Sequence, residues 1–446
     1  MKTTLPWRVY ALGAILFVAL TICSHYFGDR GGPYFMASLS LSGISYLIAI
    51  REFFRTRDAR GTPAFSRRVT VCGLILAAVW HVEFLRLPSG ADDDIHRYVW
   101  DGRLQRLGYN PYLVVPNDPA VKSLHTAETR NLNNPNLPSP YPPGAQLFFR
   151  AVISIRESTF AMKVAFVLCD FAIALILLDL LRTTGRAEHL VLAYAWNPLL
   201  AIEVAGSGHV DIVGALLLLI SVAALARRWR TIAAVAFGLA VAVKFLPIVL
   251  LPLYWKRIRI RDAGLAVVLV ALLYLPFLNH GRIFFGSLGT YVNSFRFNGP
   301  VFAILDHVAP PQLLVGLALL VGLATAAWLR RASPNFSPDK FAWPMAASLI
   351  CAPAVFPWYL LWLVPFLTSA STLLIIVWTV SIIPVYIQWH SRALTGVWGP
   401  LPGWVMWLEY GWVAVAGAAI IFRRTTRPLA ANNDASRECT APDTNS

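Results

Sequence analysis

The sequence predicts an all-α polytopic membrane protein, a bundle of about 10–14 transmembrane helices with a long, partly helical extracytoplasmic first loop. Of its 446 residues, 57% are hydrophobic and only 14% are charged, whereas a soluble domain carries roughly 25% charged residues. Apolar runs also recur from Val9 to about Phe422. We therefore expect one integral membrane domain, residues 1–422, followed by a polar, disordered cytoplasmic tail, residues 423–446.

The apolar runs give the expected spans. The first is longer than the apolar part of a secretory signal and lacks a clear cleavage site, so we take it as a span. The candidate runs are Val9–Tyr26, Tyr34–Ile50, Val69–Leu85, Phe160–Leu181, Leu190–Val204, Val210–Ala226, Thr231–Val243, Phe245–Trp255, Gly264–Leu278, Leu313–Leu329, Phe341–Val355, Trp358–Leu367, Thr372–Trp389 and Trp404–Phe422.

Helix breaks and basic residues together predict the topology. Lys244 and Pro247 interrupt one apolar stretch, and Pro353 and Pro357 interrupt another. When each interrupted stretch counts as two short helices, every basic cluster falls on one side, which the positive-inside rule assigns to the cytoplasm. Both termini are then cytoplasmic. The net charge of +15 is explained by this asymmetry, and no nucleic-acid partner is expected.

On this topology four polar features reach the outer face. They are Gly90–Asp101, Lys244, the Gly281–Pro310 loop and the Pro353–Trp358 turn. The first belongs to the only long non-spanning stretch, residues 87–159, and a loop of that length is usually either functional or disordered. Its many aromatic and proline residues argue against disorder.

The loop begins with three consecutive aspartates. Ser89 to Asp92 resembles a capping box, so a helix is expected to begin there, with the aspartates in its first turn. On that helix Asp94, Arg97, Tyr98 and Asp101 share one face. Asp92 is most simply a capping residue, and Asp101 either pairs with Arg97 or binds substrate.

Asp93 and Asp94 are harder to explain structurally, because adjacent like charges are unfavourable unless a cation binds there. They suit either a general base or a divalent-cation site, with Mg or Mn as the candidate ion. Further along, GYNPY, PNDP and YPPGAQ are predicted to be extended or turn segments. They either shape a rigid loop or, through aromatics such as Tyr141, stack on a sugar ring.

Several motifs resemble one family. DDIHRYVWDGRLQRLGYNPY, YPPGAQLFF, GSGHVD, GLAVAVKFLPIVLLP and FPWYLLW are similar to bacterial GT-C glycosyltransferases, specifically the polyprenyl-phosphate-sugar-dependent mannosyltransferase-like membrane enzymes. The resemblance covers roughly residues 87–367. It implies a GT-C-like bundle whose first large outer loop carries the catalytic acid, a donor sugar on a polyprenyl phosphate, and transfer at the outer face.

The resemblance also implies roles for single residues. The arrangement of Asp94, Arg97 and Tyr98 is similar to that in lipid A aminoarabinose transferases, whose acid begins the motif. This favours Asp94 as the base, with Asp93 beside it. Three consecutive aspartates depart from the D-x-D or D-E form of the family, so the choice among them stays open. Lys244 matches the family lysine that faces the lipid phosphate; the alternative is a lysine that extends to the interface from a helix end.

Two further residues are candidate ligands of the substrate. His209, near Glu203 and Asp211, either binds phosphate or acceptor or is an ordinary interface histidine. Arg296, in the Gly281–Pro310 loop, is a second candidate for the phosphate. With Tyr141, these residues complete the expected substrate-binding set of Arg97, Tyr98, Asp101 and Lys244.

The sequence therefore predicts a membrane hexosyltransferase, with mannose as the expected sugar. It would act at the outer face of a bacterial cytoplasmic membrane, on a glycan or lipid-linked acceptor, and it requires no cofactor beyond the open question of a divalent cation. The alternative is a transporter or flippase of a lipid-linked or polar substrate. A transporter should show inverted repeats and charges near the bilayer midplane, whereas here the acids lie in one outer loop.

Overall fold

The computed structural model describes residues 7–55, 65–90, 93–281, 283 and 285–426. All its named elements are helical. Within these residues, eight helices are long and apolar enough to cross a membrane, or nine if one sharply bent pair counts as a span. The prediction of an all-α polytopic membrane protein is confirmed. The number of long helices is below the expected 10–14 because the chain also builds its interior from shorter helices.

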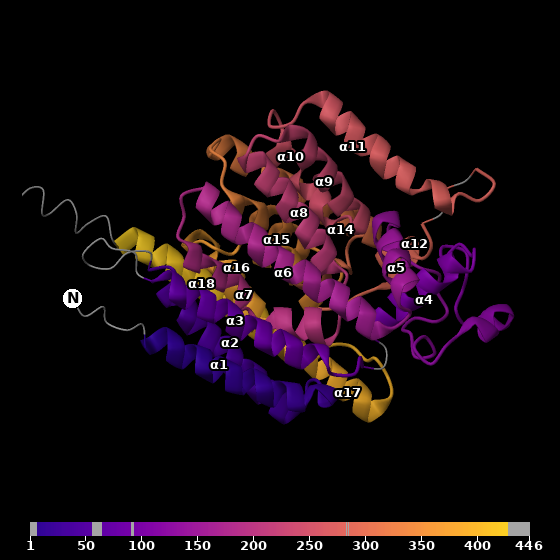
Figure 1. The fold of residues 1–446 in the computed structure, drawn as a ribbon, viewed down its shortest axis with the longest axis horizontal. Coiled ribbons are helices and arrows are strands. Elements are labelled where there is room, and N and C mark those ends of the chain that lie inside the picture. The colour runs from indigo at the N-terminus through magenta and orange to yellow at the C-terminus, as the bar shows by residue number, and fades with distance from the viewer. Residues whose placement is uncertain (1–6, 56–64, 91–92, 282, 284, 427–446) are drawn as a thin grey trace, which may run out of the picture.

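The candidate spans pack against one another and against shorter helices (Figure 1). Helices α1 and α2 pack closely against each other, α1 also contacts α3, and α16 packs on α18. The spanning elements are α1 (Trp7–His25), α2 (Pro33–Phe53), α3 (Arg67–Leu85), α6 (Thr159–Thr183), α11 with its 3-10 turn (Ile260–Phe277), α14 (Pro311–Ala332), Ala370–Thr395 with α16 (Leu373–Ser381) and α17 (Ile387–Thr395), and α18 (Gly403–Thr426).

Short helices fill the interior. A π-helix, Leu200–Gly206, is followed at a bend of 114° by α8, Asp211–Ala226. Most residues of α8 are buried, and a helix that is apolar on all sides is expected to be buried by its neighbours. It packs chiefly on α9, Arg230–Val243, and on α6.

Both predicted helix breaks are confirmed. Helix α9 ends at Lys244, whose backbone is extended, and the chain returns through the 3-10 helix Leu246–Leu250 and α10, Leu251–Tyr254. Likewise α15, Ala342–Ile350, is followed by the 3-10 helix Pro357–Trp362. Proline lacks the N–H that a continuing helix requires and clashes with the preceding turn, so each stretch splits.

The long first loop contains two helices that lie together at one end of the molecule (Figure 1). Helix α4 runs from Asp94 to Arg106 and α5 from Pro143 to Ile155. Gly102 allows their close approach, because a Cβ at that position would lie 2.7 Å from a side-chain carbon of Ile153.

Helix α4 begins later than predicted, at Asp94, with Asp93 as the N-cap residue. Asp92 and its expected capping role lie outside the described residues.

The YPPGAQ segment also differs from the prediction. Tyr141 and Pro142 are not helical, but Pro143 occupies the first turn of α5. Proline is favoured there because the first helical N–H has no intrahelical partner to lose. The proline pair thus marks the start of a helix that was expected to be a turn.

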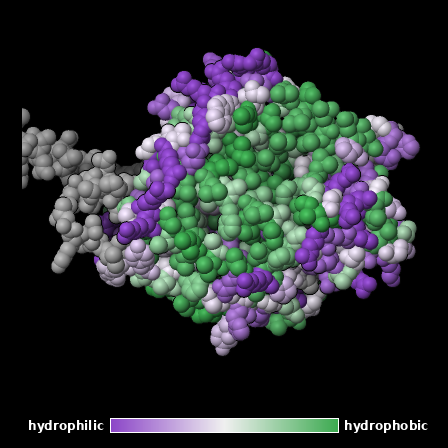
Figure 2. All heavy atoms as spheres, viewed as in Figure 1, coloured by the Kyte–Doolittle hydropathy of each residue, from purple (hydrophilic) through white to green (hydrophobic). Residues whose placement is uncertain are grey.

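Polar and apolar residues are separated on the surface. Figure 2 shows a broad hydrophobic band across the visible face, with hydrophilic side chains gathered beyond it toward either end. One end carries α4, α5 and the rest of the long loop. The other carries basic residues at helix ends, such as Arg51, Arg230, Lys256 and Arg330. We call these the loop end and the basic end of the bundle.

Candidate active site at the loop end

The four outer features predicted from the sequence meet at the loop end. Phe297 of the Gly281–Pro310 loop exchanges backbone hydrogen bonds with the Pro353–Trp358 turn: its N–H donates to Pro353 O at 3.0 Å, and its carbonyl accepts from Val355 N at 2.7 Å. In the long loop, the side chain of Asn134 donates to the Tyr291 hydroxyl at 3.3 Å. The ammonium of Lys244 lies 3.8 Å from the centre of the Tyr359 ring.

The two adjacent aspartates have different surroundings. Asp93 is 5% exposed. One of its oxygens lies 2.8 Å from the Arg30 guanidinium, and the other accepts the Gly90 N–H at 2.7 Å. Arg30 also donates to Ser207 Oγ at 2.8 Å. Asp93 therefore fastens the start of α4 to the helix break that precedes α8.

Asp94, in contrast, is partly exposed. Its Oδ1 accepts a hydrogen bond from the side-chain amide of Asn133, and no ion pair to it is found among the described residues. A carboxylate with one oxygen oriented and a partly open surface is suited to accept a proton from a bound hydroxyl. Of the two described aspartates, Asp94 is the better placed for that chemistry.

Arg97, Tyr98 and Asp101 lie behind Asp94 and are only 3%, 0% and 1% exposed. The Arg97 guanidinium donates to the carbonyls of Asn134 and Leu137 and lies 3.5 Å from Asp101. Of the two roles left open for Asp101, the structure contains the ion pair with Arg97. These side chains are deeply buried, and the substrate-binding role expected for them stays a prediction.

Asp101 instead joins α4 to α5 and to the chain between them. Its carboxylate accepts hydrogen bonds from Ser139 Oγ and, at 2.9 Å, from the side chain of Gln146. Burial raises the pKa of Asp101, while Arg97 and the two hydrogen bonds oppose the shift. This hydrogen-bond network holds in place the segment that contains Asn133, the residue that binds Asp94. The contribution of Asp101 to the site is therefore positional.

The Asp94 carboxylate influences the pKa of three tyrosines. Burial, and then the Asp94 carboxylate, raise the pKa of Tyr141 and also of Tyr291. Both rings are partly exposed. Burial, followed by the carboxylates of Asp94 and Asp211, raises the pKa of Tyr98. The turn before α8 also packs on α4, because a Cβ on Gly208 would lie 2.6 Å from Ile95 Cδ1. Helix α4 and the start of α8 therefore contribute to one polar cluster.

Lys244 is held by a buried acid. Its ammonium lies 2.8 Å from Asp211 Oδ1, and the same oxygen accepts from Trp362 Nε1 at 2.7 Å. The Lys244 side chain is 26% exposed, whereas that of Asp211 is 1% exposed. Three N–H bonds are available on an ammonium, so Lys244 can bind an anion while it keeps Asp211. It is not the freely extending lysine of the alternative interpretation.

His209 lies in the tight turn between the π-helix and α8. Gly208, with φ of +79°, allows this turn to approach Ile95 of α4. The His209 ring stacks on Trp358 at 4.0 Å, and its Nδ1 lies 2.9 Å from Glu203. His209 is 3% exposed, so its described contacts are those of a packed interface residue.

Arg296 lies in another part of the Gly281–Pro310 loop. Its guanidinium pairs with Asp306 at 3.1 Å and stacks 4.4 Å from the centre of the Phe302 ring. Its remaining described hydrogen bonds go to the carbonyls of Asn293 and Phe295. The described contacts connect Arg296 to its own loop, and its role toward a phosphate stays a prediction.

A cation site at Asp93 and Asp94 has a poor donor set. Both oxygens of Asp93 are engaged by Arg30 and Gly90. Over the described part of the chain, no group of three or more His, Cys, Asp or Glu side chains is arranged to hold a metal ion. Asp93 thus has no oxygen without a partner in this arrangement, and dependence on a divalent cation stays a prediction.

Sequence reasoning missed four residues of the cluster as site residues: Asn133, Asp211, Tyr291 and Tyr359. Asp211 had a recognisable signal. A carboxylate at the start of an almost wholly apolar helix needs a cation partner, and Lys163 and Lys244 are the two lysines inside neighbouring apolar stretches. Asn133, Tyr291 and Tyr359 carry no such signal, because their place depends on how the loops fold together.

Comparison with known proteins identifies the family. Residues 18–257 match the family model described as alpha-(1->6)-mannopyranosyltransferase, N-terminal domain. The chain belongs to this family. It is a membrane glycosyltransferase, and the expectation of a mannosyltransferase-like membrane enzyme is confirmed at the level of the family. The match decides against the transporter alternative. No curated protein matches the chain.

One solved structure is similar to this chain. It is the crystal structure of ArnT from Cupriavidus metallidurans bound to undecaprenyl phosphate, with 15% sequence identity and a TM-score of 0.44. The similarity covers 81% of this chain and 73% of ArnT. The assignment of the chain to its family rests on the match of residues 18–257 to the family model.

Proposed function

We propose that this glycosyltransferase transfers mannose from a polyprenyl-phosphate donor to a glycan or lipid-linked acceptor at the outer face of the cytoplasmic membrane. One observation carries the proposal. Asp94 is partly exposed and adjoins Ile95, which packs at Gly208 in the turn just before Asp211, the partner of Lys244. Asp94 as the proton acceptor and Lys244 as the cation for the leaving phosphate thus both lie at the loop end of the membrane bundle.

In the proposed reaction, the acceptor hydroxyl gives its proton to Asp94 as its oxygen bonds to the anomeric carbon. The bond between that carbon and the phosphate oxygen breaks, and its electron pair leaves with the polyprenyl phosphate. Attack opposite the leaving group inverts the anomeric configuration. Asn133 orients the Asp94 carboxylate through Oδ1, which leaves the second oxygen to take the proton.

Lys244 is proposed to offset the negative charge that grows on the departing phosphate. Fixed charges aimed at a developing anion stabilise the transition state more than the ground state. The Asp211 carboxylate and the Tyr359 ring hold the ammonium in place, so it need not reorganise during the reaction. The partly exposed rings of Tyr141 and Tyr291 are candidates to stack on the sugar, because aromatic faces pack on apolar sugar surfaces.

The donor class can be tested directly. Purified protein would receive radiolabelled mannose either on a polyprenyl phosphate or on GDP, together with a synthetic α-mannooligosaccharide acceptor. We expect transfer from the lipid donor only and, given the name of the family, an α-(1→6) linkage in the product. Transfer from GDP-mannose alone would show that the donor is a nucleotide sugar, and the proposed role of Lys244 toward a lipid phosphate would fail with it.

A further inference from the structure

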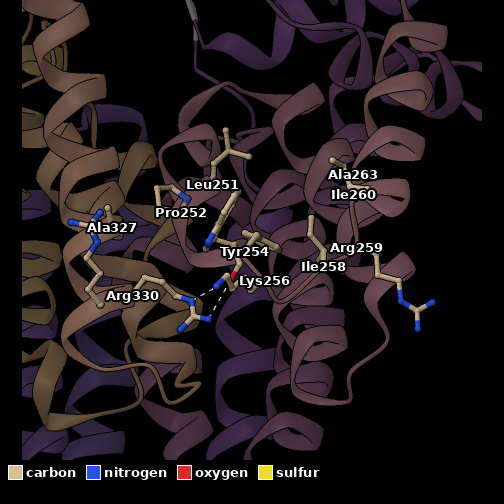
Figure 3. A pocket seen from close by; sticks show the side chains of 12 residues that line it. Leu251, Pro252, Tyr254, Lys256, Ile258, Arg259, Ile260, Ala263, Ala327 and Arg330 are labelled. Atoms are coloured by element: carbon tan, nitrogen blue, oxygen red, sulfur yellow. Dashed lines mark hydrogen bonds between the residues drawn. The ribbon is translucent and has the colours of Figure 1, made fainter.

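A second candidate binding site lies at the basic end, away from the Asp94 cluster. A cavity of about 770 Å³ lies between the end of α10, the start of α11 and the end of α14. In Figure 3, Leu251, Pro252 and Tyr254 lie between Ala327 and Arg330 on one side and Ile260 and Ala263 on the other. The walls are mostly apolar, and the rim carries Lys256, Arg259, Arg330 and Arg331.

The rim has an excess of positive charge that the protein does not neutralise. In the described part of the chain, none of these four basic side chains forms an ion pair with a carboxylate. The Arg330 guanidinium turns toward the Trp255–Lys256 turn (Figure 3) and makes only long hydrogen bonds, 3.3–3.4 Å, to the carbonyls of Trp255 and Pro334. Burial and the nearby Arg330 lower the pKa of Arg257, as expected where like charges gather.

The cavity continues onto surfaces that suit acyl chains. Helix α11 packs on α9, and α14 packs on α10 and α15, so both helices leave apolar faces uncovered. Only 17% of the apolar window of α11 and 22% of that of α14 are buried. Exposed side chains along these faces include Leu265, Val268, Leu272, Leu319 and Leu320. Trp255, 69% exposed, and Trp328, 65% exposed, are typical of side chains at the level of lipid headgroups.

We propose that this cavity binds one anionic phospholipid of the leaflet at the basic end. The headgroup phosphate would lie against Arg330, Arg331 and Lys256, and the acyl chains would run along the uncovered faces of α11 and α14. Basic pockets between transmembrane helices are suited to such lipids, because the arginines supply charge and the neighbouring apolar walls supply contact area. The site is separate from the proposed glycosyl transfer and does not depend on it.

The test measures bound lipid by native mass spectrometry of the purified full-length protein. Phosphatidylglycerol should be retained in preference to phosphatidylcholine, and millimolar inorganic phosphate or glycerol phosphate should not displace it. Arg330→Gln/Arg331→Gln should weaken retention at least about 10-fold, since each basic residue near an anionic surface contributes about 1 kcal/mol. Arg51→Gln/Arg68→Gln is the matched control: it removes the same charge from exposed positions at the same end and should leave retention unchanged.

A second variant tests the cavity without changing charge. Ala263→Trp would fill the space between the two walls and should also weaken retention of phosphatidylglycerol. Equal weakening by the matched control would mean that the lipid is held by diffuse charge and would overturn the proposal. Unchanged retention in both the Arg330→Gln/Arg331→Gln and the Ala263→Trp variants would overturn it as well. So would displacement of the lipid by free phosphate, which would identify a soluble anion as the ligand.

Discussion

The ammonium of Lys244 lies 2.8 Å from the Asp211 carboxylate and 3.8 Å from the centre of the Tyr359 ring. Lys244 ends α9, Asp211 begins α8, and Tyr359 follows the break after α15. The contacts of Lys244 thus connect three interrupted helices. A lysine that is both paired and partly exposed is anchored, and it still presents donors to an incoming anion.

Lys244→Ala should impair use of the lipid-linked donor. A hydrogen bond to a charged group contributes about 1.5–3 kcal/mol, so kcat/KM for the polyprenyl-phosphate sugar should fall about 10- to 100-fold. Lys244→Arg keeps the charge but changes its geometry and should fall less. The control is Lys122→Ala, an exposed lysine in the long loop, with wild-type kinetics expected. Wild-type kcat/KM in Lys244→Ala would remove Lys244 from the phosphate site.

Asp93→Ala should destabilise the protein more than it slows the chemistry. Asp93 and Arg30 are 5% and 8% exposed, and breaking a buried ion pair costs about 3–5 kcal/mol because one charge stays buried without a partner. Thermal unfolding in detergent should show this loss, and Arg30→Gln/Asp93→Asn should recover part of it. Activity per folded molecule should stay within about 10-fold of wild type. A fully stable but inactive Asp93→Ala protein would make Asp93 the base.

The Asp101 carboxyl should make stability depend on pH. Its pKa is raised in the folded protein, so the folded state holds this proton more tightly than the unfolded state. Stability should therefore fall as pH rises from the ordinary aspartate pKa of about 3.9 toward the raised value, and stay lower above it. The melting temperature from pH 4 to 8 would show this, and Asp101→Asn should flatten that component. Asp118→Asn, at an exposed loop position, should keep the wild-type slope; a parallel slope in Asp101→Asn would contradict the assignment.

The orientation in the membrane follows from the two ends of the bundle. Reporter fusions after Arg230 and Arg261, at the basic end, should read cytoplasmic, and fusions near Val121 and Phe297, at the loop end, should read extracytoplasmic. Both sets are needed, because the basic clusters predict only which end stays inside. A cytoplasmic signal at Val121 would place the Asp94 cluster on the wrong side for transfer at the outer face.

Residues with strong local signals were predicted well. The breaks at Lys244 and at Pro357 follow from a charge or a proline inside an apolar stretch, and the structure contains both. The start of α4 was misplaced because the capping box predicted from Ser89 to Asp92 is not followed directly by the helix, which begins at Asp94. In the structure Asp93 is the N-cap residue, yet its side chain binds Arg30 in place of the helix N–H groups.

The local sequence could not separate the two described aspartates. Asp93 and Asp94 are neighbours with the same chemistry, and the difference between them comes from residues far along the chain. Arg30, which binds Asp93, is 63 positions away from it in the sequence. Asn133, which orients Asp94, is 39 positions away from it. Such long-range partners leave no periodic or spacing signal. For the same reason the face shared by Arg97, Tyr98 and Asp101 was predicted, but not the burial of that face beneath the loop.

The most direct measurement compares Asp94→Asn with wild type. The substitution keeps the shape of the side chain and removes its ability to accept a proton. The purified variant should transfer mannose from a polyprenyl-phosphate donor at least about 10²-fold more slowly, with an unchanged melting temperature. A folded Asp94→Asn protein with wild-type transfer, or an active Asp93→Asn/Asp94→Asn double variant, would contradict the assignment of Asp94 as the base.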